Sequence, residues 1–172
     1  MIDAQLTTEI FGLFSPARAD VATQIALLPI QTTAREESED ISKFYVTMYS
    51  LASLNTEKTL SERIHWMANK ARKVLPDNSY PAKMFDYSRK LYESGITWEQ
   101  TRDSIYYRYQ VQQKDSYDIT SKNLYCNGCF AAGINFAASL VSLFYGEGDL
   151  VKTIKIGTLT GWDSDNPTAT WG

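Results

Sequence analysis

Residues 128–145 read GCFAAGINFAASLVSLFY. This stretch is rich in small side chains, namely Ala131, Ala132, Gly133, Ala137 and Ala138. Small side chains let neighbouring helices approach closely, so we predict a central helix with other helices packed around it. No part of the chain alternates apolar and polar residues long enough to demand a strand. The predicted fold class is therefore all-α, a helical bundle formed by a single domain over residues 1–172.

The segment after this helix has clear start and stop signals. Gly146-Glu147-Gly148 predicts a turn, and Asp149 is a suitable N-cap for an amphipathic helix that runs to about Leu159. That helix leads the chain to Gly161 and the last twelve residues.

Two amphipathic helices are predicted at the amino terminus. The first is marked by apolar residues at helical spacing, which are Ile2, Leu6, Ile10 and Leu13. The second is expected to run from Pro16 to Leu28, with Ser15 as its N-cap and an end near Pro29. We expect the second helix to bury Val21, Ile25 and Leu28.

Capping signals divide the middle of the chain. Residues 33–36 have the capping-box pattern, Thr followed by Glu three residues later, and predict the start of a helix that reaches about Leu54. Asn55-Thr56 restarts the chain into a helix that ends at Pro76. Ser79 and Pro81 then predict another helix start. That helix should reach Gly95.

A second capping box, at residues 97–100, opens the next helix. Residues 111–125 are polar and poorly periodic, so we predict a loop there.

The composition excludes several classes of protein. The 172 residues are 44% hydrophobic and 22% charged, which is ordinary for a globular domain with a real core. A net charge of −3 provides no field that would attract nucleic acid. Neither a membrane-spanning run nor a signal peptide is predicted, so a cytoplasmic location is the default expectation. Two cysteines do not form a disulfide framework, which favours a reducing compartment.

The last stretch, residues 161–172, reads GWDSDNPTATWG and holds the densest group of oxygen ligands. Asp163, Asp165 and Asn166 offer carboxylate and amide oxygens, which Mg²⁺, Mn²⁺ or Ca²⁺ prefer. Pro167 suits the first turn of a helix, whose N-terminus favours an anion such as phosphate. The same residues are also ordinary helix-start residues, with Asp165 or Asn166 as the N-cap. Both interpretations stay open on the local pattern.

Two further groups of residues are candidate functional sites, and each gives a weaker indication than residues 161–172. Cys126 and Cys129 have the C-x-x-C spacing, but a zinc site would need two more ligands, and the sequence offers only His65 besides. We therefore interpret the cysteines as two small residues at a helix start. His65 is expected to be a structural residue of its helix.

A resemblance to a known family rests on residues 144–150, which read FYGEGDL, the helix after them, and residues 161–165, which read GWDSD. Together they resemble the C-terminal half of the ADP-ribosylglycohydrolase family, and residues 2–16 look like the middle of that family. The resemblance implies an all-α hydrolase that uses two Mg²⁺ ions, with Mn²⁺ as a substitute, to remove ADP-ribose from modified acceptors. It maps Asp163 and Asp165 onto metal ligands, and Asn166 takes the place of the family's Thr or Ser.

The chain also departs from the family pattern. It has no Thr-Asp-Asp motif and stops at Gly172, so we expect an incomplete bundle of the ADP-ribosylglycohydrolase type, a fragment that is inactive alone. The general acid or base is not expected within this chain. Two alternatives stay open: a non-catalytic pseudoenzyme that binds ADP-ribose or is structural, and a helical interaction domain in which the two aspartates only cap a helix.

Overall fold

The computed structural model describes residues 4–54, 59–119 and 125–172. The prediction at Ile2 and the restart at Asn55-Thr56 lie outside this part of the chain. Every regular element in the described ranges is helical and none is a strand, which confirms the all-α fold class. The chain divides into two compact units, residues 1–76 and 77–172.

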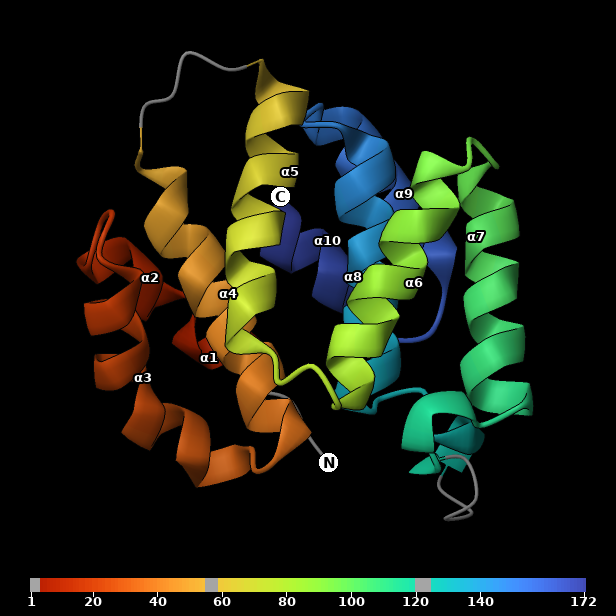
Figure 1. Cartoon of the computed structure of the whole chain (residues 1–172), viewed down its shortest axis with the longest axis horizontal. Helices are drawn as coiled ribbons and strands as arrows, with labels where there is room; N and C mark the ends of the chain where they lie inside the picture. The colour runs from red at the N-terminus through yellow and green to blue at the C-terminus, as the bar shows by residue number, and fades with distance from the viewer. Residues whose placement is uncertain (1–3, 55–58, 120–124) are drawn as a thin grey trace. The chain divides into compact units, whose positions relative to one another are not determined.

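The first unit contains five α-helices in its described part. They are α1 (Gln5–Thr8), α2 (Ile10–Phe14), α3 (Ala19–Thr33), α4 (Glu37–Ala52) and α5 (Leu60–Ala71), followed by the short 3-10 helix η1 (Arg72–Val74). One buried cluster joins α3 to α4 and the amino-terminal residues, and consists of Ala4, Ala22, Ala26, Ile30, Ala34 and Val46. Phe11 packs against this cluster. The helices are drawn in red to yellow in Figure 1.

The prediction of which faces are buried at the amino terminus is wrong. Leu6, Ile10 and Leu13 are each about half exposed, and in α3 Ile25 and Leu28 are 44% and 76% exposed. The core side of α3 is instead the row Ala22, Ala26 and Ile30. The physical reason is close approach, because small side chains on α3 let it pack tightly on α4.

Gly12 on α2 shows the same close approach. A Cβ added to this residue would lie 2.5 Å from the Val46 backbone oxygen and 2.6 Å from the Tyr49 Cβ. Helix α2 therefore contacts α4 through its glycine, and its larger apolar side chains Ile10, Leu13 and Phe14 are about half exposed or more.

The predicted boundaries in this unit also need correction. Pro29 lies inside α3 rather than at its end, and Ser15 follows α2 instead of capping the next helix. Thr33 is the last residue of α3, and α4 begins at Glu37 after Glu36, so the capping box at residues 33–36 does not form. His65 is half-buried within α5.

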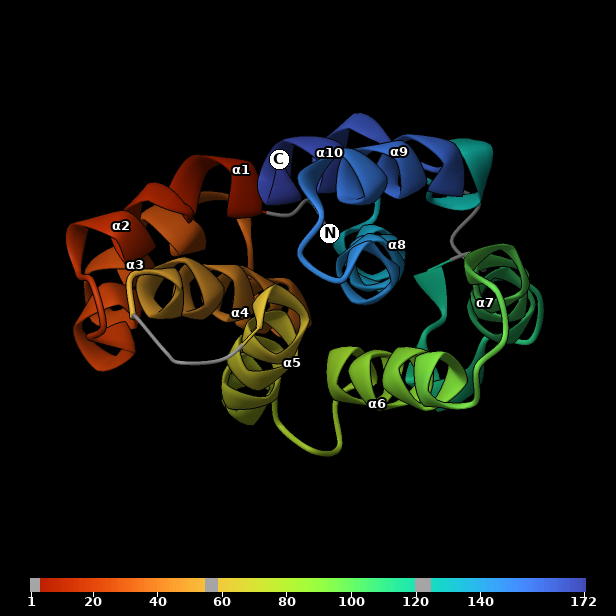
Figure 2. The ribbon, with the colours of Figure 1, turned by 90° about the horizontal axis from the view of Figure 1, so that it is seen from above.

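The second unit is arranged around the predicted central helix. It contains α6 (Tyr80–Glu93), α7 (Trp98–Ile105), the π-helical turn η2 (Tyr106–Val111), the 3-10 turns η3 (Lys114–Ser116) and η5 (Tyr125–Asn127), α8 (Ala132–Gly146), α9 (Leu150–Thr160) and α10 (Asp165–Trp171). Helices α6, α7, α9 and α10 all pack on α8 (Figures 1 and 2). Every residue of α8 except Tyr145 is buried, which confirms the central position within this unit.

Three predicted caps of this unit are confirmed. The Ser79 side chain accepts from the Ala82 N–H, and the Asp149 side chain accepts from the Lys152 N–H. Thr97 and Gln100 form the reciprocal capping box that the sequence predicts. Within the described ranges, no helix has both the length and the apolar content needed to cross a bilayer.

Candidate functional site

The candidate site is the turn between α9 and α10. Gly161 has a φ of 101°, which favours glycine, and Trp162 follows with a φ of 56°. The next helix starts at Asp165 with Pro167 in its first turn, which confirms the predicted helix start. The N-cap position belongs to Ser164, not to Asp165 or Asn166, and the Ser164 side chain makes no capping hydrogen bond. The predicted N-cap is therefore wrong.

The three predicted metal ligands differ in exposure. Asp163 is half-buried, Asp165 is exposed and Asn166 is buried. Their carboxylate and amide oxygens suit a hard cation. Across residues 4–54, 59–119 and 125–172, His, Cys, Asp and Glu form no group of three or more that could hold a metal ion. The metal assignment stays a prediction.

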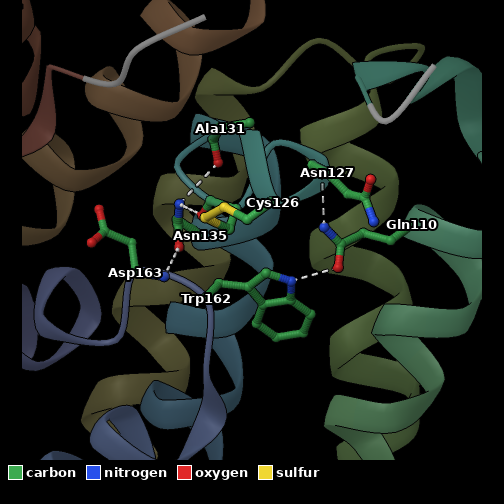
Figure 3. The surroundings of a disulfide bond; sticks show 8 residues. Gln110, Cys126, Asn127, Ala131, Asn135, Trp162 and Asp163 are labelled. Atoms are coloured by element: carbon green, nitrogen blue, oxygen red, sulfur yellow. Dashed lines mark hydrogen bonds between the residues drawn. A yellow bond between two sulfur atoms is a disulfide. The ribbon is translucent and has the colours of Figure 1, made fainter. Parts of the chain in front are cut away.

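A buried amide fixes the backbone of Asp163. Asn135 lies on α8 and is fully buried. Its side-chain oxygen accepts from the Asp163 N–H at 3.2 Å, and its Nδ2 donates to the backbone oxygens of Cys129 (2.8 Å) and Ala131 (3.1 Å). Figure 3 shows Asn135 between these groups, with the Asp163 carboxylate pointing away from the disulfide. Three of the four bonds that this amide can make are thus accounted for.

A second amide holds Trp162. Its indole Nε1–H donates to the Gln110 Oε1 at 2.5 Å, and the Gln110 Nε2 donates to the Asn127 backbone oxygen at 3.2 Å (Figure 3). Gln110 belongs to η2, in which the Gln112 N–H donates to the Tyr107 oxygen five residues earlier. Both amides therefore connect the turn after α9 to the segment just before α8.

That segment is closed by a disulfide between Cys126 and Cys129, whose Cα atoms are 5.5 Å apart. The interpretation of the cysteines as two separate small residues is wrong. Residues 126, 127 and 128 all have positive φ, at 45°, 56° and 75°. The flanking rings of Tyr125 and Phe130 are exposed and stack with centroids 6.2 Å apart.

The acidic residues of the 144–150 segment have structural partners. Glu147 accepts from the Tyr92 hydroxyl at 2.8 Å and pairs with Lys152 at 2.9 Å. Burial, together with the Glu147 charge, raises the pKa of Tyr92 to about 12. Asp149 serves as the helix cap described above. This segment therefore fixes the α8–α9 connection.

Sequence reasoning missed the two bridging amides. Asn135 could have been noticed as an amide within a run of small and apolar residues. Gln110 and Trp162 are 52 residues apart, so no local spacing relates them. Comparison with protein families, with curated proteins and with solved structures finds no match for this chain.

Proposed function

We propose that this chain contributes a metal-binding turn to an ADP-ribosylglycohydrolase-like hydrolase, which removes ADP-ribose from a modified acceptor with the help of Mg²⁺. Asp163, Asp165 and Asn166 are the proposed ligands. One observation carries the proposal: the buried Asn135 anchors the acidic turn, yet Ser164, and none of the three proposed ligands, occupies the N-cap position. A side-chain N-cap at Asp165 or Asn166 therefore does not account for the Asp-x-Asp pattern, and Asp165 lies in the first turn of α10, where a carboxylate is favourable.

The donor chemistry fits part of a magnesium shell. Mg²⁺ prefers near-octahedral oxygen coordination and keeps several waters, and two carboxylates with one amide provide some of these positions. A bound metal would supply positive charge that orients the ribose and a nucleophilic water. This chain's own contribution is to hold the Asp163 backbone, through Asn135, at the start of α10. Mn²⁺, with similar ligand preferences, is expected to substitute.

A non-catalytic role is the second candidate. The described residues contain no third acidic or histidine side chain grouped with the two aspartates. That observation favours a pseudoenzyme that binds ADP-ribose without hydrolysing it.

Calorimetry with Mg²⁺, Mn²⁺ and ADP-ribose tests the proposal. We expect Mg²⁺ to bind, ADP-ribose to bind more tightly when Mg²⁺ is present, and Asp163→Asn and Asp165→Asn each to weaken both. Asp103→Asn, which changes an exposed carboxylate of α7, is the matched control and should leave binding unchanged.

Turnover separates the two candidates. The protein encoded by the full open reading frame should release ADP-ribose from an ADP-ribosylated peptide. Asp163→Asn should abolish this release. Binding without release supports the non-catalytic role. Binding of neither metal nor ADP-ribose overturns both and leaves a helical interaction domain.

A further inference from the structure

The Cys126–Cys129 disulfide closes a short turn in an unfavourable backbone conformation. Cys126 and Asn127 are not glycines, yet both adopt positive φ, and Gly128 continues the run. Such conformations persist where the surrounding structure enforces them, and the cross-link spans all three of these residues. Cys126 and Asn127 are exposed, so a reductant in solution can reach the turn.

Two hydrogen-bonded connections lead from this turn to residues 162 and 163. The Cys129 oxygen is joined through Asn135 to the Asp163 N–H, and the Asn127 oxygen is joined through Gln110 to the Trp162 indole (Figure 3). Each bridging amide donates at one end and accepts at the other. It can satisfy both only while both ends stay in place.

We propose that Cys126–Cys129 is a reversible redox site whose state sets the order of the Gly161–Asp163 turn. The co-reactant is a dithiol. One of its thiolates attacks a protein sulfur and breaks the S–S bond, and its second thiol resolves the mixed disulfide. Two electrons and two protons reach Cys126 and Cys129, which become thiols, while the dithiol becomes a disulfide.

The two bridging amides transmit the change. Without the cross-link, Cys126 is free to leave positive φ, and the Asn127 and Cys129 carbonyls lose their fixed positions. Asn135 and Gln110 then hold Asp163 and Trp162 less firmly. The backbone that carries the oxygen-rich turn becomes less ordered.

Thiol titration and ¹H–¹⁵N NMR of the whole chain test the coupling without any metal. Dithiothreitol should raise the number of titratable thiols in the chain from zero to two. It should also shift or broaden the NMR signals of the Trp162 indole and the Asp163 amide. The Trp171 indole, which donates to the Ser139 oxygen, is the internal control and should not move. The double variant Cys126→Ser, Cys129→Ser should show the reduced-type spectrum and no response to dithiothreitol.

Gln110→Ala tests the two connections separately, because it removes only the hydrogen bonds that join Asn127 to the Trp162 indole. In this variant, reduction should still move the Asp163 amide but no longer the Trp162 indole. Identical spectra before and after reduction overturn the proposal. The proposal is also overturned if glutathione disulfide fails to oxidise the reduced Cys126 and Cys129 back to a disulfide.

The coupling extends to metal binding, and this step rests on the proposed function. Loss of one anchoring hydrogen bond should weaken Mg²⁺ binding by about threefold to tenfold on reduction. If the NMR signals move but Mg²⁺ binds in neither state, the metal proposal fails and the redox coupling stands. If Mg²⁺ binds equally in both states and the signals do not move, the coupling fails and the metal site stands.

Discussion

The side-chain oxygen of Asn135 accepts the backbone N–H of Asp163 at 3.2 Å, across 28 residues of sequence. The same amide donates to two carbonyls that precede α8. One fully buried side chain therefore ties the start of the central helix to the turn that begins α10.

Asn135→Ala should destabilise the chain by about 2 kcal/mol or more, because it leaves buried backbone groups without a partner. Urea denaturation gives the free energy of unfolding. Asn78→Ala, which changes an exposed amide of the same unit, is the control and should stay within about 0.5 kcal/mol of the wild type. Equal effects of the two substitutions would contradict the anchoring role.

The packing of α3 predicts a contrast between two neighbouring aliphatic residues. Ile30 is fully buried and Leu28 is 76% exposed. Ile30→Ala should cost about 2–5 kcal/mol of stability, whereas Leu28→Ala should cost about 0.5 kcal/mol or less. Thermal and urea unfolding of both variants measure this difference. A larger loss at Leu28 would mean that α3 buries the face that hydropathy alone predicts.

Gly133→Ala should destabilise the second unit. A Cβ at this position would lie 2.6 Å from the Tyr117 ring and 2.7 Å from the Tyr80 ring, and both rings are buried. Overpacking of this kind costs about 1–3 kcal/mol. At Gly157 the nearest atoms to an added Cβ are two hydroxyl oxygens at 3.1 and 3.2 Å, so Gly157→Ala should cost less. Denaturant midpoints that rank the two variants in the opposite order would refute this packing.

Stability should fall in strong alkali, partly through Tyr92. Burial and Glu147 raise the pKa of its hydroxyl to about 12, above the ordinary value near 10. The folded state thus holds this proton more tightly than the unfolded chain does. The contribution to stability is complete below pH ~10 and is lost as the pH rises through ~12.

Tyr92→Phe should therefore show a smaller loss of stability between pH ~10 and ~12 than the wild type. Urea denaturation across this range, with both proteins compared at each pH, measures the difference. Parallel curves for the two proteins would show that Tyr92 does not contribute to the alkaline transition.

Local signals account for what the sequence predicts correctly. Ser79, Thr97 and Asp149 cap their helices because a cap needs only a side chain and an N–H two or three residues later. The abundance of small residues in 128–145 likewise identifies the central helix. These features depend on neighbours in the sequence, so spacing is enough to find them.

The failures have physical causes that spacing cannot reveal. Residues 33–36 have the same capping-box pattern as residues 97–100. However, α3 continues past Pro29 and ends at Thr33, so Thr33 is not available to begin the next helix. Helix α3 has apolar residues on two faces, and tight packing buries the face with Ala22, Ala26 and Ile30. In the candidate site, the anchors of Trp162 and Asp163 come from residues tens of positions away, so only the fold brings them together.

Because Tyr106–Val111 forms a π-helical turn, the position of the Gln110 side chain depends on the number of residues in this segment as well as on their identity. An i→i+5 turn contains one residue more than an α-helical turn, and Gln110 reaches Trp162 from this wider spacing. Removing a single codon there would restore α-helical geometry and rotate the following side chains by about 100° around the helix axis. A one-residue deletion that leaves every named contact residue in the gene could therefore disconnect the indole as effectively as replacing the glutamine.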